Sequence, residues 1–219
     1  MNTALQAVLF DMDGTLVDTE RLWLRAVEEE ALGLGLALTA EDLAFVLGRA
    51  IDDSAAHLAA RSAGRADRAR LGESLERRFT ELVRRELVPM PGAVELLAAL
   101  GAAGLLTALV SASPRPVVDT ALDALGRQWF TTSVAEGETP RTKPFPDPYR
   151  AALTALGVDP ARCVAVEDTP TGVASAEAAG CAVLAVPSYA AIAPAPRRTV
   201  VRSLLDVDLT LLRRLAAAS

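Results

Sequence analysis

The segment Ala7-Val-Leu-Phe-Asp-Met-Asp-Gly-Thr15 constrains the fold of this chain more than any other. The apolar run Ala7–Phe10 predicts a buried strand, and two carboxylates follow it at positions i and i+2. Alternation along a strand places Asp11 and Asp13 on one side, and Gly14 allows the backbone to turn sharply behind them. Open α/β sheets bind ligands at the carboxyl ends of their strands, so this arrangement indicates divalent-metal and phosphoryl chemistry.

Further strand signals recur along the chain and alternate with helical patterns. Strands are predicted at Leu105–Val110, Cys163–Val166 and Cys181–Val186, with a weaker signal at Thr132–Val134. Helices are predicted between and after them, at Val94–Leu100, Val117–Leu125, Pro148–Leu156 and Gly172–Ala179. This alternation is typical of a parallel, doubly wound α/β sheet, a Rossmann-like core.

Residues 17–88 differ, because their pattern is helical throughout and contains no convincing strand. Helices are predicted there at Val17–Leu32, Ala40–Leu47, Ser54–Ala60 and Ala66–Leu87. The proline-rich segment 89–92 then marks the return to the α/β pattern. We therefore predict an α/β catalytic core from residues 1–16 and 89–219. An all-helical cap domain, residues 17–88, is inserted after the first strand, over the strand ends that carry the two acids.

Charge and apolar content limit the partners of the chain. A net charge of −6 and a pI near 4.9 argue against nucleic acid, and the eight arginines of residues 61–86 stand among five acids, as on a solvated helix face. The longest apolar stretch, 96–110, is interrupted by glycines and does not suit a membrane span, and no signal peptide precedes the first strand. Cys163 and Cys181 are expected to be buried free thiols, which suits a cytoplasmic protein.

Polar residues follow the apolar runs at four places: Asp11 with Asp13, the segment 111–113, Lys143, and Glu167-Asp168. We expect all four at one edge of one sheet. Lys143 is the single lysine among 22 basic residues and stands in a proline-flanked loop. Lysine is a compact point charge and arginine a broad fork, so a small cation is predicted there between a carboxylate and a phosphate.

These residue types fit phosphoryl transfer. A carboxylate can attack phosphorus and form an aspartyl-phosphate, provided that Mg²⁺ and a lysine neutralise the developing charge. Asp11, Glu167 and Asp168 can supply carboxylate ligands to Mg²⁺, and Asp13 its main-chain carbonyl. Asp13 is also the natural candidate for the acid that protonates the leaving alkoxide and later deprotonates water.

Three further positions complete the predicted site. The hydroxyl of Ser111 and the amide of Ala112 can donate to phosphate oxygens, although an isolated serine is more often an ordinary loop residue. The Glu167-Asp168 pair has an alternative interpretation as acids at a helix N-terminus. His57, the only histidine, lies in the predicted cap, so a histidine-based mechanism in the core is not expected.

The four motifs resemble those of the haloacid dehalogenase superfamily, in the segments Asp11–Thr15, Ser111, Lys143–Pro148 and Glu167–Gly172. Their order and spacing are similar to its phosphatase and β-phosphoglucomutase-like branch, which has a helical cap after the first motif, and the resemblance covers nearly the whole chain. The resemblance implies that Asp11 is the nucleophile and Asp13 the general acid/base. It also implies that Ser111 and Lys143 bind phosphate, and that Glu167 and Asp168 bind Mg²⁺.

Differences between members of the superfamily limit the branches that this chain resembles. True dehalogenases lack the second aspartate, here Asp13, and the phosphonate-cleaving members use a cap lysine that this chain lacks. The β-phosphoglucomutases carry a histidine in the first cap helix where this chain has Trp23, which disfavours a mutase. Trp23 either walls the substrate pocket or packs in the cap core. Arg49 either binds a substrate oxygen or second phosphate, or is solvated; His57 is expected chiefly as a cap helix residue.

The sequence thus predicts a Mg²⁺-dependent phosphatase for a small phosphorylated metabolite, a sugar or polyol phosphate in the first instance. The alternative enzyme is a phosphomutase in which phosphorylated Asp11 returns its phosphate to a sugar. A third possibility, from another class, is a non-catalytic regulator that senses a phosphometabolite, although such proteins usually lose a motif residue and this chain keeps all four. A monomer or weak homodimer is expected.

Overall fold

A computed structural model describes residues 4–47, 49, 51–188 and 190–217. The chain divides into two compact units, which we call the α/β unit, Met1–Val17 with Val88–Ser219, and the helical unit, Asp18–Leu87. The boundaries lie one residue inside the predicted limits of 17–88. Where the chain leaves and re-enters the α/β unit, Val17 forms an antiparallel bridge with Pro89 and the amide of Met90 donates to the carbonyl of Leu16 at 2.8 Å.

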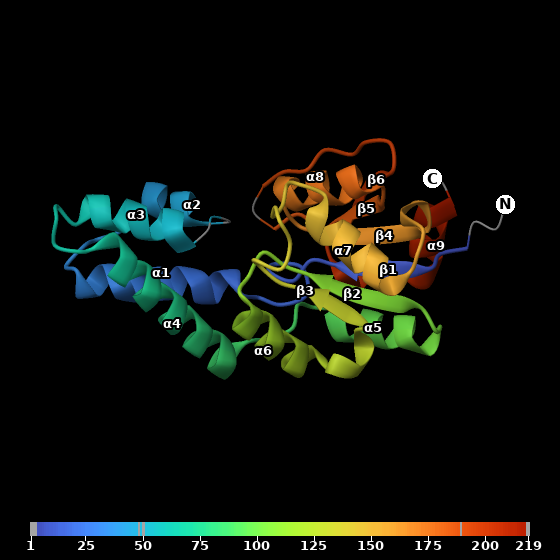
Figure 1. Ribbon diagram of the computed structural model, residues 1–219, viewed down its shortest axis with the longest axis horizontal. Coiled ribbons are helices and arrows are strands. Elements are labelled where there is room, and N and C mark those ends of the chain that lie inside the picture. Colours follow the sequence, from blue (N-terminus) through green and yellow to red (C-terminus); the bar gives the residue numbers. More distant parts are fainter. Residues whose placement is uncertain (1–3, 48, 50, 189, 218–219) are drawn as a thin grey trace. The chain divides into compact units, whose positions relative to one another are not determined.

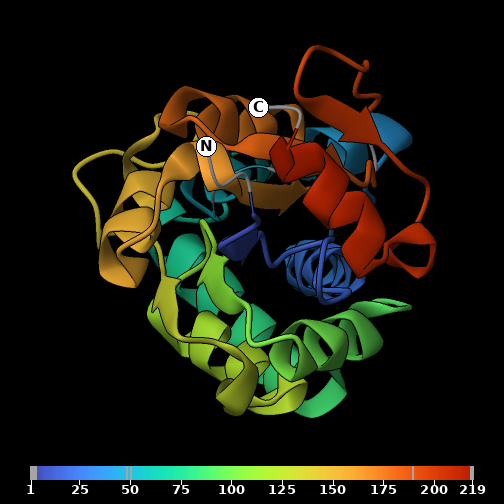
Figure 2. The same cartoon turned by 90° about the vertical axis from the view of Figure 1, so that its right-hand side faces the viewer.

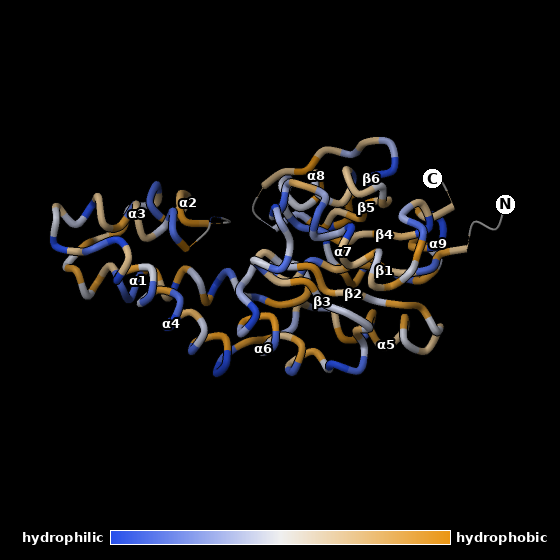
Figure 3. Tube along the Cα trace, viewed as in Figure 1, coloured by the Kyte–Doolittle hydropathy of each residue, from blue (hydrophilic) through white to orange (hydrophobic). Residues whose placement is uncertain are grey.

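The α/β unit is built on a six-stranded sheet in which every neighbouring pair is parallel, in the order β3-β2-β1-β4-β5-β6. The strands are β1 Ala7–Phe10, β2 Leu106–Val110, β3 Thr132–Val134, β4 Cys163–Glu167, β5 Ala182–Ala185 and β6 Arg198–Val200. Figure 3 shows hydrophobic residues gathered along the strands between the two edges, β1, β2, β4 and β5. Apolar runs of this kind suit a parallel sheet that is covered on both faces, and the predicted fold class is confirmed.

Helices cover both faces of the sheet (Figures 1 and 2). On one face α7 and α8 pack against the strands, and on the other α5 contacts β2 while α9 contacts β4 and β5. The helices of this unit are α5 Ala93–Ala102, α6 Arg115–Leu125, α7 Asp147–Leu156, α8 Pro170–Ala179 and α9 Leu209–Ala217. Short 3₁₀ turns occupy Arg127–Trp129, Pro160–Arg162 and Leu204–Asp206.

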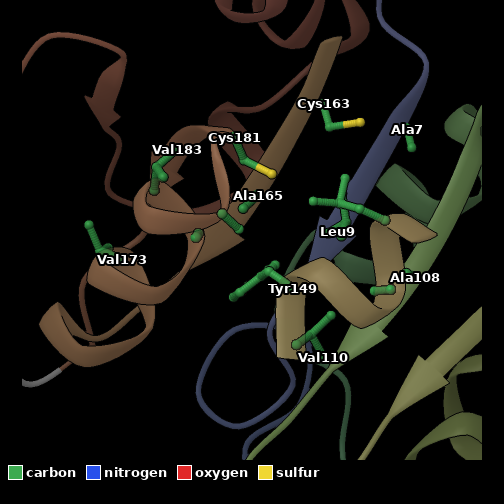
Figure 4. Close-up of a cluster of buried hydrophobic side chains, with 14 of the residues drawn as sticks. Ala7, Leu9, Ala108, Val110, Tyr149, Cys163, Ala165, Val173, Cys181 and Val183 are labelled. Carbon is green, nitrogen blue, oxygen red and sulfur yellow. The ribbon is translucent and has the colours of Figure 1, made fainter. Parts of the chain in front are cut away.

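A buried cluster fills the space between the sheet and the helices α7 and α8 (Figure 4). Leu9 contributes to it from β1 and Tyr149 from α7, while Phe10, the next residue along β1, is equally buried but outside this cluster. Cys163 and Cys181 belong to the same cluster and are free thiols, as predicted. Burial raises the pKa of each thiol to about 12, so both remain protonated at neutral pH.

The helical unit consists of α1 Glu20–Gly33, α2 Ala40–Val46, α3 Ile51–Arg61 and α4 Arg68–Glu86, with α4 packed against α1 and α3. The predicted start of the first helix at Val17 is wrong, because Val17 pairs with Pro89 and the helix begins at Glu20. Side chains cap two of these helices: Thr39 accepts from Asp42 at the start of α2, and Asp67 accepts from Arg70 at the start of α4.

Two elements near the C-terminal end were not predicted. Strand β6 has only three residues, all half-buried, and therefore lacks an apolar run. Helix α9 does carry a signal, because Asp208 accepts from the amide of Leu211 ahead of a regular leucine pattern. None of the helices in the described part of the chain combines the length and the hydrophobicity that crossing a bilayer requires.

Candidate active site

The strand order places the predicted site at a switch point of the sheet. From β1 the chain proceeds outward to β2 and β3, and later returns to β4 on the other side of β1. Phe10 is in register with Leu109 of β2 and with Val166 of β4, so the residues that follow these strands meet at one edge. Ligands of doubly wound sheets bind where the strand order reverses, at the carboxyl ends.

The two aspartates leave β1 as predicted. The amide of Asp11 donates to the carbonyl of Val166 at 2.9 Å, which keeps this residue at the end of the sheet. Gly14 has a φ of +77°, and its amide donates to the carbonyl of Val17 at 2.9 Å, which closes the turn. The left-handed backbone at this position explains the glycine.

Lys143 is the cation at the centre of the site. Its Nζ donates to Asp11 Oδ1 at 2.6 Å, to Glu167 Oε1 at 2.7 Å and to the carbonyl of Val110 at 2.9 Å, so each of its three protons has an acceptor. Burial of this ammonium lowers its pKa, but the two carboxylates outweigh burial and raise the pKa above its usual value. Lys143 is therefore charged throughout the physiological range.

Two serines hold the second aspartate. Ser111 Oγ donates to Asp13 Oδ2 at 2.9 Å, and Ser113 Oγ donates to the same oxygen at 2.8 Å. The amide of Ser113 in turn donates to Ser111 Oγ at 2.9 Å, and Ala112 between them is exposed. Sequence reasoning assigned a role to Ser111 and Ala112 but missed Ser113, although the second serine follows in the same segment.

The acidic pair at the end of β4 has its own supports. Glu167 is fully buried, and its Oε1 accepts from Tyr149 Oη at 2.6 Å in addition to Lys143. Asp168 Oδ2 accepts from Ser188 Oγ at 2.6 Å. Neither Tyr149 nor Ser188 was predicted. Burial and the neighbouring Glu167 carboxylate raise the pKa of Tyr149 well above its usual value, so its hydroxyl is a donor.

Among the residues that the structure describes, three buried carboxylate oxygens have no hydrogen-bond partner in the protein: Asp11 Oδ2, Glu167 Oε2 and Asp168 Oδ1. The three side chains place a carboxylate oxygen each within 4.8 Å of one another. Burial raises the pKa of Asp11 well above its usual value, against the charge of Lys143, and raises that of Asp168 to about 7. A hard divalent cation with oxygen ligands fits this set, because it would satisfy all three oxygens at once. A ligand role for the Asp13 main-chain carbonyl stays a prediction.

The predicted substrate residues of the helical unit make contacts within that unit. Trp23 is buried, and its Nε1 donates to the carbonyl of Val46 at 2.9 Å. Arg49 is exposed, with its guanidinium 4.2 Å from the centre of the Phe45 ring. His57 lies on α3, and its ring stacks on the same Phe45 ring, with 4.3 Å between the two ring centres. A role of these residues toward substrate stays a prediction.

The sequence of the chain is similar to that of a known family and of several named proteins. Residues 5–180 match the family model of haloacid dehalogenase-like hydrolases. The chain is 37% identical to hexitol phosphatase A and 33% identical to hexitol phosphatase B of Escherichia coli K12; the matches cover 81% of both chains for the first, and 96% of this chain and 94% of the relative for the second.

A solved structure extends the likeness to the fold. A single-residue variant of CbbY from Rhodobacter sphaeroides, in complex with xylulose-1,5-bisphosphate, is 28% identical to this chain and superposes with a TM-score of 0.81. The superposition covers 95% of this chain and 99% of that chain. The likeness therefore spans both the α/β unit and the helical unit.

Proposed function

The chain belongs to the haloacid dehalogenase-like hydrolases, and from this membership we propose that it is a Mg²⁺-dependent phosphatase acting on a small sugar or polyol phosphate. The observation that carries the proposal is the set of three unpartnered carboxylate oxygens beside Lys143, at the strand edge that also carries Asp13. Buried oxygens without partners are costly, and a bound cation would satisfy them.

In the proposed reaction the carboxylate of Asp11 attacks phosphorus and forms an aspartyl-phosphate, while the bond from phosphorus to the alcohol oxygen breaks. Asp13 protonates the departing alkoxide and then takes a proton from the water that hydrolyses the aspartyl-phosphate. The products are the free alcohol and inorganic phosphate. Ser111 and Ser113, which hold Asp13 through its Oδ2, fix the direction of that carboxylate.

Charge is the main obstacle to this attack, since the nucleophile and the phosphate are both anionic. Lys143 already contacts Asp11 Oδ1 at 2.6 Å and supplies one fixed positive charge. A Mg²⁺ ion held by Asp11, Glu167 and Asp168 would supply further charge neutralisation. The amide of Ala112 is proposed to bind a phosphate oxygen. The hydroxyl of Ser111 is proposed to do the same, and its proton, which now goes to Asp13 Oδ2, would have to turn to the phosphate, leaving Ser113 to hold Asp13.

The substrate class rests on the relatives. Two are named hexitol phosphatases, and CbbY is solved with a phosphorylated pentulose. We also propose that residues 18–87 act as the cap that selects substrate, with Trp23 and Arg49 as the residues that contact it. A sugar or polyol monophosphate is accordingly the substrate to test first.

The test is phosphate release from a panel of hexitol, hexose and pentose phosphates, with Mg²⁺ or with EDTA. The wild type is expected to release phosphate from a few of these esters only with Mg²⁺, and Asp11→Asn is expected to release none while remaining folded. Asp123→Asn, which changes an exposed aspartate on α6, is the matched control and should retain activity. Undiminished release by Asp11→Asn would refute the proposal, and conversion of a sugar 1-phosphate to a 6-phosphate would favour the mutase.

A further inference from the structure

Tyr149 stands out among the core residues because it brings a hydroxyl into an apolar cluster. It is fully buried on α7 and lies among Leu9, Val110 and Ala165 in the cluster between the helices and the sheet (Figure 4). A phenylalanine would fill the same volume without a polar atom to satisfy. A buried phenol needs a hydrogen-bond partner, and here that partner is the Glu167 carboxylate, at 2.6 Å.

The Tyr149 contact determines which oxygen of Glu167 remains available. Oε1 accepts from Tyr149 at 2.6 Å and from Lys143 at 2.7 Å, so two donors, one on α7 and one in the loop before it, hold this oxygen in place. The lysine is itself held in place, since its Nζ also lies 5.2 Å from the centre of the Tyr149 ring. Oε2 is then left without a protein partner, beside the unpartnered oxygens of Asp11 and Asp168.

We propose that Tyr149 is a positioning residue for the divalent cation: its hydroxyl engages Glu167 Oε1 and thereby directs Oε2 toward the metal. The inference rests on the proposed function, since it requires the cation site formed by Asp11, Glu167 and Asp168. Tyr149 itself does not contact the substrate or the cation. It acts through Glu167, because mutation of a group that hydrogen-bonds to a metal ligand typically lowers metal affinity or activity by about 10- to 100-fold.

The experiment measures Mn²⁺ binding to the metal-stripped full chain, by electron paramagnetic resonance of the free ion, with Mg²⁺ as competitor. Tyr149→Phe keeps the ring and removes only the hydroxyl, so the cluster stays filled. We expect its Kd for Mn²⁺ to rise roughly 10-fold or more. The Mg²⁺ concentration for half-maximal phosphate release should rise in parallel, while kcat at saturating Mg²⁺ stays near that of the wild type.

Thr107→Val is the matched control, because it removes another buried hydroxyl, which donates to the carbonyl of Trp129. It changes β2 three residues before Val110, the strand's last residue, and should leave the Mn²⁺ Kd unchanged. Equal Kd values for wild type and Tyr149→Phe would overturn the inference, as would a lower kcat of Tyr149→Phe that saturating Mg²⁺ does not restore. Absence of Mn²⁺ binding by the wild type would instead overturn the proposed cation site.

Discussion

Replacing Gly172 by alanine places one methyl group where the buried carboxylate of Glu167 now lies. Gly172 is the third residue of α8 and has no positive φ, so its backbone accepts any residue. On helix propensity alone, alanine would stabilise the helix by about 1 kcal/mol. The added Cβ, however, would stand 1.9 Å from Glu167 Oε2 and 2.1 Å from its Cδ, well inside van der Waals contact.

The size of the expected loss of stability follows from the contacts that hold the Glu167 carboxylate. The carboxylate cannot turn aside freely, since Tyr149 and Lys143 donate to its Oε1 at 2.6 and 2.7 Å. Overpacking costs about 1–3 kcal/mol, and a lost hydrogen bond to a charged group about 1.5–3 kcal/mol. With the helix gain of ~1 kcal/mol subtracted, the free energy of unfolding should fall by roughly 1.5–5 kcal/mol. At about 2–4 °C per kcal/mol, Tm should fall by roughly 3–20 °C.

Thermal unfolding of the metal-free protein by circular dichroism, together with Mn²⁺ binding, checks this prediction. Gly172→Ala should have the lower Tm and a weakened affinity for Mn²⁺, because Glu167 is displaced. The control is Gly72→Ala in α4, where the added Cβ would meet the Ala55 Cβ at an ordinary 3.8 Å and should raise stability. If Gly172→Ala were as stable as the wild type and bound Mn²⁺ equally well, the carboxylate would not be the reason for this glycine.

Two further perturbations address the charges of the site. Lys143→Arg should lower kcat by about 100-fold, because a planar guanidinium does not fit where Nζ contacts Asp11, Glu167 and Val110 at 2.6–2.9 Å; assays at saturating Mg²⁺ that gave wild-type turnover would contradict this. Burial raises the pKa of Asp168 to about 7 from an ordinary 3.8, so between these values the folded protein holds a proton that the unfolded chain has lost. The Tm of the metal-free protein should therefore fall as the pH rises from about 5 to about 8, and Asp168→Asn should make Tm less dependent on pH. A Tm that rises with pH over this range would contradict the prediction.

β3, a mostly half-buried strand at one edge of the sheet, gave only a weak signal, although its predicted limits are correct. The strands between the two edges were predictable because they are buried: β1 has the predicted limits, and β2, β4 and β5 differ by one residue at one or both ends. Burial of this kind requires apolar runs, which are visible in the sequence. At the edge of the sheet, β6 pairs on one side only, and its three half-buried residues carry no such run. Its strand conformation comes from the register with β5, which no local pattern encodes.

The charged residues of the site were predictable, because a charge at the end of a buried strand has no role in packing the core. Asp11, Lys143 and Glu167 meet as expected, because the parallel register brings the strand ends to one edge. Tyr149 was missed, since a tyrosine on the buried face of a helix reads as an ordinary core residue. Ser188 was missed for a related reason: its contact with Asp168 bridges 20 residues and depends on where β5 ends.

The bridge between Val17 and Pro89, with the hydrogen bond from Met90 to Leu16, ties the two ends of the insertion together inside the α/β unit. The contacts that join the two ends of the insertion are therefore made by residues outside 18–87. Insertions tolerate change best when their ends are close and fixed in this way. The α/β unit and the inserted helical unit are thus separable parts of the chain, and each can change in sequence at its own rate.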